Sequence, residues 1–263
     1  MTVKTDAKHN TILGIDLGSR NVKICLMRDG AVADTSSIET VAFYRGYGVR
    51  TDRGFTLDFS ALGFPDADRV VATGYGRMAA ALAGADNISE LTAHMAGAIH
   101  QTGELDFTLL DMGGQDYKIV RVEGGRMTDM ATNDKCAAST GRYIENMAKV
   151  LGISLDELGR HYDDPVLLSA TCAIFGESEL IGMIVAGEPT ERLAAGVNRA
   201  VVERVLPFLG RMGDGLILMS GGVALNPSVM RILSRETGRE VRVLPDPVHN
   251  GAVGCCVRGA AAG

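Results

Sequence analysis

A chain of 263 residues, with 46% hydrophobic and 22% charged residues, holds enough apolar material for one large domain or two half-size ones. Its formal net charge of −6 argues against bulk attraction to nucleic acid or anionic lipid, and an aromatic content of 5% argues against a surface that stacks single strands. The sequence has no signal-peptide pattern and no membrane-spanning run, and its 5 cysteines are too irregularly spaced for a disulfide framework. We therefore expect a cytoplasmic protein with reduced thiols and no membrane or nucleic-acid partner.

The chain begins with two predicted strands that are joined by a turn containing glycine. Residues 11–16 are apolar and end in Asp16, and residues 21–27 alternate with the period of a strand. Asp29 and Gly30 form a hairpin signal, after which a weaker third strand begins at Ala31. The predicted order is strand, turn, strand, tight turn, strand.

The next segments are less regular. Residues 43–59 are rich in glycine, tyrosine and arginine, and we expect them to be irregular. Residues 69–77 predict a buried strand that runs into a glycine turn, and residues 89–98 predict a helix of small residues. We expect His94, on that helix, to be a hydrogen-bonded core residue and not a ligand.

The opening pattern returns later in the chain. Residues 107–111 are apolar and end in Asp111, residues 118–122 alternate, and residues 123–126 turn the chain into another strand. Two matching hairpins suggest an internal duplication. We therefore predict a duplicated α/β fold with an N-terminal lobe of residues 1–105, joined by a closing helix of residues 250–263, and a C-terminal lobe of residues 106–249.

The C-terminal half alternates helices with two short strands. Pro207 is expected to kink or divide the long helix of residues 191–212. The other predicted elements are helices at 142–151, from 154, at 180–186, from 227 and at 251–262, and strands at 216–219 and 241–244.

Three turns that contain glycine follow apolar strands: Gly18-Ser19, Gly113-Gly114 and Gly221-Gly222. Glycine lets backbone N–H groups approach and surround a phosphate. Asp16 and Asp111 stand at strand ends, where a carboxylate organises Mg²⁺ through water, and Lys23 is placed to neutralise a terminal phosphate. Each turn alone is better explained as an ordinary turn, but their order and spacing favour phosphate binding.

Two cysteines stand near predicted helix starts. Cys136 lies in the segment 133–141 and Cys172 in the segment 169–179. A helix N-terminus lowers the pKa of a thiol and suits a thiolate ligand or an anion. Cys25, by contrast, is better explained as a buried small residue, and the same explanation is available for Cys255 and Cys256.

These segments resemble a known family. The strand-end motifs at 15–19 and 111–116, with Ser-Gly-Gly-Val at 220–223, are similar to the phosphate and adenosine loops of the actin, Hsp70 and sugar-kinase superfamily. More narrowly, segments 72–77, 111–116, 133–141, 171–179 and 221–226 resemble the ATP-dependent activators of 2-hydroxyacyl-CoA dehydratases and the related ATPase subunits of benzoyl-CoA reductases.

The resemblance implies a ribonuclease-H-like fold of two lobes with an ATP cleft between them, and an ATPase coupled to electron transfer. It implies a homodimer holding one oxygen-sensitive 4Fe–4S cluster, with Cys136 and Cys172 of each subunit as ligands; two thiolates per chain become the four that a cubane needs. The expected catalytic residues are Asp16, Asp111, Gln115 and Asp116. The expected nucleotide-binding residues are Gly18, Ser19, Lys23, Gly113, Gly114, Asp134, Lys135, Gly221, Gly222 and Asn226.

The implied reaction is ATP hydrolysis that drives one-electron transfer from ferredoxin or flavodoxin to a partner iron–sulfur enzyme. A dehydratase, a benzoyl-CoA-type reductase and a double-cubane reductase are all candidate partners. Because Cys136 follows the second glycine turn by one strand, a change around the γ-phosphate is expected to reach the cluster through that strand and the next helix. Two alternatives from other classes are a small-molecule kinase, which needs neither cysteine, and a nucleotide-binding regulator without catalysis.

Overall fold

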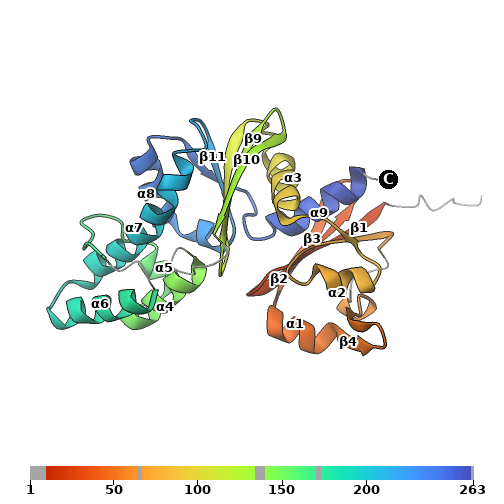
Figure 1. Cartoon of the computed structure of the whole chain (residues 1–263), viewed down its shortest axis with the longest axis horizontal. Coiled ribbons are helices and arrows are strands. Elements are labelled where there is room, and N and C mark those ends of the chain that lie inside the picture. The colour runs from red at the N-terminus through yellow and green to blue at the C-terminus, as the bar shows by residue number, and fades with distance from the viewer. Residues whose placement is uncertain (1–9, 64–66, 134–139, 170–172, 262–263) are drawn as a thin grey trace, which may run out of the picture. The chain divides into compact units, whose positions relative to one another are not determined.

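The computed structural model describes residues 10–63, 67–133, 140–169 and 173–261 (Figure 1). The chain forms two compact units. Unit 1 comprises residues 1–100 and 249–263, and unit 2 comprises residues 101–248. The C-terminal helix therefore belongs by its contacts to the N-terminal unit.

Unit 1 is built on a five-stranded sheet in the order β3-β2-β1-β6-β7. Its strands are β1 (Thr11–Leu17), β2 (Asn21–Arg28), β3 (Ala31–Glu39), β6 (Arg69–Gly74) and β7 (Asp86–Asn87). The first three strands are antiparallel, whereas β6 pairs parallel to β1 and β7 pairs parallel to β6. The parallel pairings require crossover connections, which the helices of the unit provide.

Helices cover both faces of this sheet, so β1 is buried along its whole length (Figure 1). Leu13, Ile15 and Leu17 pack into one core cluster with Phe43 of α1 (Thr40–Tyr47), which also draws in residues of α2 (Arg77–Leu82). On the other face, Ile12 packs with α9 (Asn250–Ala261), beside α3 (Glu90–Thr102). This two-sided burial explains why β1 reads as a continuous apolar run and not as an alternating one.

The segment 43–59 is regular, contrary to the expectation from its composition. Residues up to 47 belong to α1, and β4 (Gly48–Thr51) then pairs with β5 (Gly54–Leu57) as a two-stranded hairpin, followed by the short 3₁₀ helix η1 (Ser60–Leu62). The ring of Phe43 lies 5.2 Å from that of Tyr47, one helical turn away. The aromatic side chains thus hold α1 against the sheet, and the glycines mark only its end and the hairpin turn.

Helices α3 and α9 approach each other at glycines. A Cβ atom added at Gly254 of α9 would overlap the carbonyl oxygen of Ala93 and lie 2.9 Å from the amide nitrogen of Gly97, both on α3. A Cβ atom added at Gly97 would likewise overlap the carbonyl oxygen of Asn250. The two backbones are therefore in contact without intervening side chains.

We expect Gly254→Ala to destabilise the protein by about 1–3 kcal/mol, because the added methyl group meets rigid backbone that cannot move aside. Gly46→Ala is the matched control: Gly46 lies in helix α1 of the same unit, with no atom within 4 Å of an added Cβ, so alanine should stabilise by roughly 0.5–1 kcal/mol. Urea unfolding measures both changes. Equal midpoints for the two variants would contradict the close approach.

Unit 2 repeats the sheet of unit 1, in the order β10-β9-β8-β11-β12. Its strands are β8 (Phe107–Met112), β9 (Tyr117–Glu123), β10 (Arg126–Asn133), β11 (Ile217–Ser220) and β12 (Val241–Val243). Again the first three strands are antiparallel and the last two are parallel. Both hairpins turn through two consecutive residues with positive φ, Asp29-Gly30 (49° and 82°) and Gly124-Gly125 (54° and 72°), as the right-handed twist of paired strands favours.

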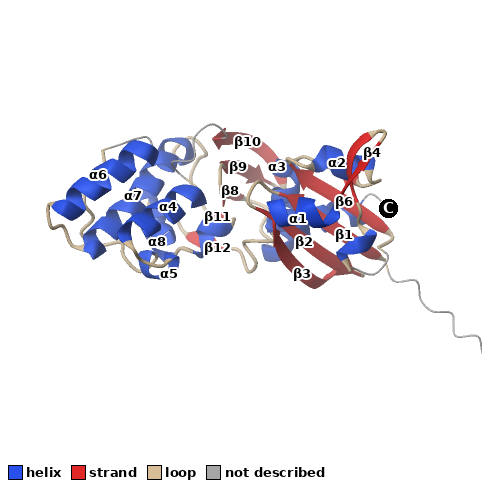
Figure 2. Cartoon of the chain, turned by 90° about the horizontal axis from the view of Figure 1, so that it is seen from below, coloured by secondary structure: helices blue, strands red, loops and turns tan. Residues whose placement is uncertain are grey.

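The remaining elements of unit 2 are mostly helices (Figure 2). They are α4 (Gly141–Leu151), α5 (Leu155–Leu158), α6 (Ala173–Val185), α7 (Thr190–Leu209), η3 (Gly222–Leu225) and α8 (Pro227–Thr237). Pro207 does not divide α7, because it stands in the last turn, where few backbone hydrogen bonds remain to be lost. In the described part of the chain, no helix combines the length and the apolar character that crossing a membrane requires.

Candidate functional site

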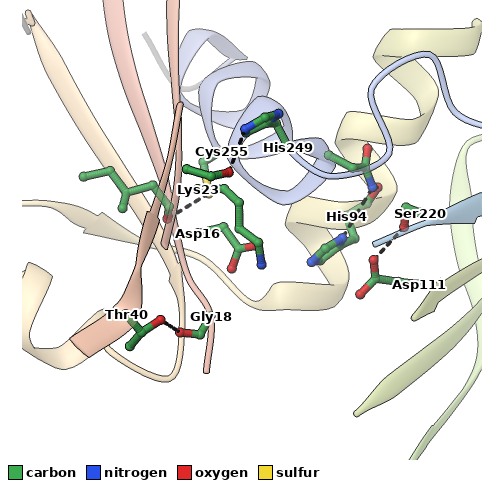
Figure 3. A network of polar contacts seen from close by, with 12 residues as sticks. Asp16, Gly18, Lys23, Thr40, His94, Asp111, Ser220, His249 and Cys255 are labelled. Atoms are coloured by element: carbon green, nitrogen blue, oxygen red, sulfur yellow. Dashed lines mark hydrogen bonds and ion pairs between the residues drawn. The ribbon is translucent and has the colours of Figure 1, made fainter. Parts of the chain in front are cut away.

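The first candidate loop joins β1 to β2 in unit 1. Asp16 and Lys23 are cross-strand partners in the register of these strands, and their Oδ2 and Nζ atoms lie 3.5 Å apart (Figure 3). Between them, a Cβ atom added at Gly18 would lie 2.7 Å from the carbonyl oxygen of Asn21 and 2.9 Å from Lys23 Nζ. The lysine ammonium therefore lies over the glycine of the loop, where a cation and backbone N–H groups would meet the same anion.

Other elements of unit 1 hold this loop in place. The hydroxyl of Thr40, at the start of α1, donates to the carbonyl oxygen of Gly18 at 2.8 Å (Figure 3). The first turn of α9 lies against Asp16: a Cβ atom added at Gly251 would come within 2.9 Å of Asp16 Oδ2 and 3.0 Å of His94 Nε2. Only glycine fits there, and it brings the positive end of the helix close to the carboxylate.

His94 is a buried, hydrogen-bonded residue, as its position on a helix of small residues predicted. The side-chain amide of Asn250 donates to the His94 carbonyl oxygen at 3.0 Å and lies 3.4 Å from His94 Nδ1. The ring of His94 also lies against the first turn of α9, with Nε2 close to the Cβ position of Gly251. These contacts depend on the close approach of α3 and α9, which the sequence does not reveal.

The second candidate loop joins β8 to β9 in unit 2 and repeats the first one position by position. Asp111 and Lys118 are cross-strand partners, as Asp16 and Lys23 are, and Gly113 takes the place of Gly18. The amide of Gly113 donates to the carbonyl oxygen of Asp116 at 2.9 Å, which closes the turn. Gly113, Gly114, Gln115 and Asp116 all remain partly exposed, so this turn is accessible to a ligand.

Two side chains that sequence reasoning missed orient the carboxylates of this loop. The hydroxyl of Ser220, at the end of β11, donates to Asp111 Oδ1 at 2.7 Å (Figure 3). Lys118 Nζ lies 2.7 Å from Asp116 Oδ2 and 4.0 Å from Asp111 Oδ2. Lys118 follows Asp111 by the same number of residues as Lys23 follows Asp16, and this equal spacing could have identified it from the sequence. The contact of Ser220 could not be predicted in this way, because it depends on the pairing of β8 with β11.

Gly74 and Gly221 occupy equivalent places in the two units. Gly74 is the last residue of β6 and Gly221 directly follows β11, the parallel neighbours of the two aspartate strands, and both glycines have a positive φ, 93° at Gly74 and 84° at Gly221. An added Cβ atom would lie 2.9 Å from the amide nitrogen of Leu17 at Gly74, and 3.0 Å from that of Met112 at Gly221. The conformation and the crowding both require glycine, so each of these turns lies directly against the aspartate loop of its own unit.

The predicted adenosine-loop residues divide between two roles. Gly221 and Gly222 form the turn into η3, whereas Asn226 caps helix α8, its side-chain oxygen accepting from the amides of Ser228 and Val229. The side-chain amide of Asn226 donates to Asn198 at 2.8 Å. Asn226 therefore fixes the position of α8, and a contact with adenosine stays a prediction.

Helix α4 begins on the second loop. The amides of Gly141 and Arg142 donate to the carbonyl oxygens of Gly113 and Gly114 at 2.9 and 3.0 Å. The loop thereby satisfies two of the amides that a helix start leaves without intrahelical partners. The second loop and the first turn of α4 are therefore directly connected by these two hydrogen bonds.

Four predicted site residues, Asp134, Lys135, Cys136 and Cys172, lie outside the described residues. The elements next to the two cysteines are described, and they pack together: α4 follows Cys136, and α6 begins directly after Cys172. Asn146 of α4 donates to Glu177 of α6 at 2.8 Å, and a Cβ atom added at Gly176 would lie 3.6 Å from the ring of Tyr143. The chain thus brings the helices next to both cysteines side by side.

The other three cysteines, Cys25, Cys255 and Cys256, are fully buried in unit 1, as expected for Cys25. Burial raises the pKa of Cys255, and a hydrogen bond with Cys25 together with burial raises that of Cys256. Both shifts favour the protonated thiol over the thiolate, which is the form that binds a metal. Across the described ranges, no group of three or more His, Cys, Asp or Glu residues is placed to hold a metal ion.

Comparison with known proteins identifies close relatives along nearly the whole chain. The (R)-2-hydroxyglutaryl-CoA dehydratase activating ATPase of Acidaminococcus fermentans is 35% identical over 249 residues, which are 93% of this chain and 95% of that protein. The activator of lactoyl-CoA dehydratase of Anaerotignum propionicum is 36% identical over 252 residues, again 93% and 95% of the two chains. Among solved structures, the activator of the 2-hydroxyisocaproyl-CoA dehydratase from Clostridium difficile with bound ADPNP aligns with a TM-score of 0.81 at 30% identity, covering 96% of this chain and 95% of that one.

A more distant likeness concerns the fold alone. A sugar kinase of the ROK family, the glucokinase from Streptomyces griseus in complex with glucose and AMPPNP, aligns with a TM-score of 0.55 at 12% identity over 94% of this chain and 98% of that one. Together with the repeated sheets and loops, this confirms the duplicated α/β fold of the actin, Hsp70 and sugar-kinase type. The profile of the BadF/BadG/BcrA/BcrD ATPase family matches residues 13–259, and the chain belongs to that family.

Proposed function

We propose that this protein is an ATP-hydrolysing activator that drives one-electron transfer to a partner acyl-CoA dehydratase or reductase. The observation that carries the proposal is the pair of matching loops, Asp16 to Lys23 and Asp111 to Lys118, in a chain related along its length to dehydratase activators. Each loop combines a carboxylate, a glycine and a lysine, which are the groups that phosphate and its cation require.

In the proposed reaction, Lys23 and the backbone around Gly18 and Ser19 bind phosphate, and Asp16 and Asp111 organise Mg²⁺ through water. Ser220 fixes the orientation of Asp111, leaving its Oδ2 on the side of Lys118. Gln115 and Asp116, which are partly exposed in the closed turn, are the residues that we propose to orient the attacking water. Catalysis by such a site is mostly positioning and electrostatic stabilisation, for which a rigid turn is suited.

We propose that Cys136 and Cys172 hold a 4Fe–4S cluster. Support comes from the contacts between α4 and α6, which bring the helices adjoining these cysteines together, and from the burial of Cys255 and Cys256, which raises the pKa of both thiols. When bound, a cluster supplies one-electron transfer; two cysteines per chain provide half of its ligands, so a homodimer would complete the set. Ferredoxin or flavodoxin is the proposed electron donor.

The hydrogen bonds between the second loop and α4 are the proposed route of coupling. Gly113 and Gly114 accept from the first two residues of α4, so a loop that responds to the γ-phosphate displaces the helix that follows Cys136. ATP can act in this way only if it binds two conformations with different affinity. The partner enzyme would then prefer one nucleotide state and change nucleotide affinity by the same factor.

The outer face of α6 supports the proposed dimer. Phe175 and Val185 are 69% and 84% exposed, and Ile181 and Ile184 are also exposed. A run of exposed apolar side chains along one helix is costly in water and is typical of an interface. Because α6 begins directly after Cys172, an interface here would also bring the cysteine segments of two subunits together.

We therefore expect Ile181→Asp to weaken the dimer by at least tenfold, since each subunit would bury an unpaired charge at the interface. Val41→Asp is the matched control, because Val41 is also an exposed apolar residue, on helix α1. Light scattering across a concentration series measures the dimer fraction. A dimer of unchanged strength in Ile181→Asp would place the interface elsewhere.

The proposed function is tested on anaerobically purified protein. We expect iron and sulfide at four atoms each per dimer, loss of the cluster's absorbance in air, ATP hydrolysis, and ATP-dependent reduction of a partner dehydratase. A small-molecule kinase would hydrolyse or transfer phosphate without iron, and a non-catalytic regulator would bind nucleotide without turnover. Either result would replace the proposal.

A further inference from the structure

The two aspartate loops are alike in backbone but differ at one position that faces the lysine. In both loops the glycine contacts the residue two positions before the lysine: Gly18 lies against the carbonyl oxygen of Asn21, and Gly113 lies against Asp116. Asn21 and Asp116 are therefore equivalent positions. Residues two apart along a strand point to the same side, so each of these side chains stands on the same side as its lysine.

The two lysines lie in different places. Lys23 Nζ is 2.9 Å from the Cβ position of Gly18 and 3.5 Å from its single carboxylate partner in the loop, Asp16. Lys118 Nζ is 2.7 Å from Asp116, and it is not among the atoms within 4 Å of the Cβ position of Gly113. The side chain of Lys118 is 12% exposed and that of Lys23 is 22% exposed. The charged Asp116 thus draws its lysine away from the glycine, and the neutral Asn21 does not.

We propose that the residue at this position decides the role of each lysine. Asn21 leaves Lys23 over its glycine to bind the terminal phosphate of a nucleotide. Asp116 holds Lys118 in an ion pair, so that Lys118 is a positioning residue for Asp116 and Asp111 and does not bind phosphate. Taking Lys118 to a phosphate would leave the carboxylate of Asp116, whose side chain is 13% exposed, without its cation, which is costly. This inference deepens the proposed function and rests on it.

The charge balance of the loops agrees with this division. The loop from Asp16 to Lys23 contains one carboxylate and two cations, Arg20 and Lys23, so it carries one net positive charge, which favours an incoming anion. Asp111, Asp116 and Lys118 leave one net negative charge, which favours a hydrated cation or a polarised water molecule. The two copies of the duplicated loop would in this way favour different partners, an anion at the first copy and a cation or a water molecule at the second.

The test measures ATP and ADP affinity by calorimetry, and turnover, in Asn21→Asp, Lys23→Met and their double variant. We expect Asn21→Asp to weaken ATP binding by about tenfold, the size of one lost charge-assisted contact. In the Lys23→Met background the same change should cost less than about threefold, because the cation that it captures is already gone. Asn87→Asp, an exposed substitution on β7 of the same unit, is the matched control for added charge.

In the second loop, Asp116→Asn and Lys118→Met should each lower kcat at least tenfold. The ATP affinity of each variant should stay within about threefold of wild type. The double variant should be no slower than either single variant, because both act on the same ion pair. Equal ATP affinity in Asn21→Asp and wild type would overturn the inference, as would a loss of the same size with and without Lys23. A fall in ATP affinity rather than kcat in Lys118→Met would also overturn it. A wild-type protein that binds no nucleotide would instead refute the proposed function itself.

Discussion

Asp111→Asn is expected to lower ATP turnover by about 10²–10³-fold, the cost of losing one preorganised electrostatic group. Asparagine has the same shape and keeps an oxygen that can accept the hydrogen bond from Ser220, which is now 2.7 Å from Asp111 Oδ1. The substitution removes the negative charge that we propose to organise Mg²⁺. Binding of ATP without Mg²⁺ should be unchanged or tighter, because a carboxylate has been removed from the neighbourhood of the phosphates.

A steady-state phosphate-release assay measures this effect, and calorimetry separates kcat from affinity. Asp129→Asn is the matched control, since Asp129 is an exposed residue on β10 of the same unit and contacts only the neighbouring amide of Met130 among the hydrogen bonds described for it. Ser220→Ala should lower turnover less than Asp111→Asn does, because it frees the carboxylate to rotate without removing its charge. Unchanged turnover in Asp111→Asn would show that this carboxylate is not part of the reaction.

Local features of the sequence were sufficient to predict the two hairpins and their matching ends. Strand alternation in β2, the apolar run of β1 and the Asp29-Gly30 turn are all signals within a few residues, and the structure has each of them. The same holds for the helix start at Ser154, whose side chain accepts from the amide of Glu157. Where pattern and local chemistry agree, the sequence specifies the element.

Composition alone misled the prediction for residues 43–59. The glycines suggested an irregular segment, but Phe43, Tyr44 and Tyr47 have the spacing of one helical face, and their rings contact each other in α1. The spacing of these aromatic residues predicts a helix, whereas the glycine content of the segment predicts an irregular loop, and the structure agrees with the spacing. Pro207 was expected to kink or divide the helix of residues 191–212, but α7 runs through Pro207 undivided and ends at Leu209, so only the last turn of the helix lies beyond the proline.

Contacts between distant segments could not be predicted from the sequence. Ser220 reaches Asp111 only because β11 pairs parallel to β8, and Asn250 reaches His94 only because two glycines let α9 lie on α3. Neither Ser220 nor Asn250 stands in a local sequence pattern that predicts its contact. Lys118 could be predicted from the sequence only in part. Its spacing from Asp111 repeats that of Lys23 from Asp16, but its ion pair with Asp116 depends on the closed turn.

Replacement of either proposed ligand, Cys136→Ser or Cys172→Ser, is expected to remove the iron–sulfur cluster almost completely. A serine hydroxyl is a poor replacement for a thiolate, and each substitution would remove two of the four ligands, since both subunits of a homodimer carry it. The measurements are iron and sulfide content and the visible absorbance of anaerobically purified protein. ATP hydrolysis should remain within about tenfold of wild type, because the proposed phosphate residues are untouched.

Cys25→Ala is the control that separates loss of a ligand from loss of a buried thiol. Cys25 lies in the core of unit 1, where its backbone carbonyl oxygen accepts from the thiol of Cys256 at 3.3 Å. Its replacement by alanine keeps this carbonyl group and should lower stability by about 1 kcal/mol, as the small cavity left by a buried sulfur does, and leave the iron content unchanged. If Cys25→Ala lost iron while Cys136→Ser kept it, the ligands would lie in unit 1 and the proposed link between α4, α6 and the cluster would be wrong. If all three variants kept full iron, the metal would be bound by other residues, and the protein would be a nucleotide hydrolase without the proposed electron-transfer centre.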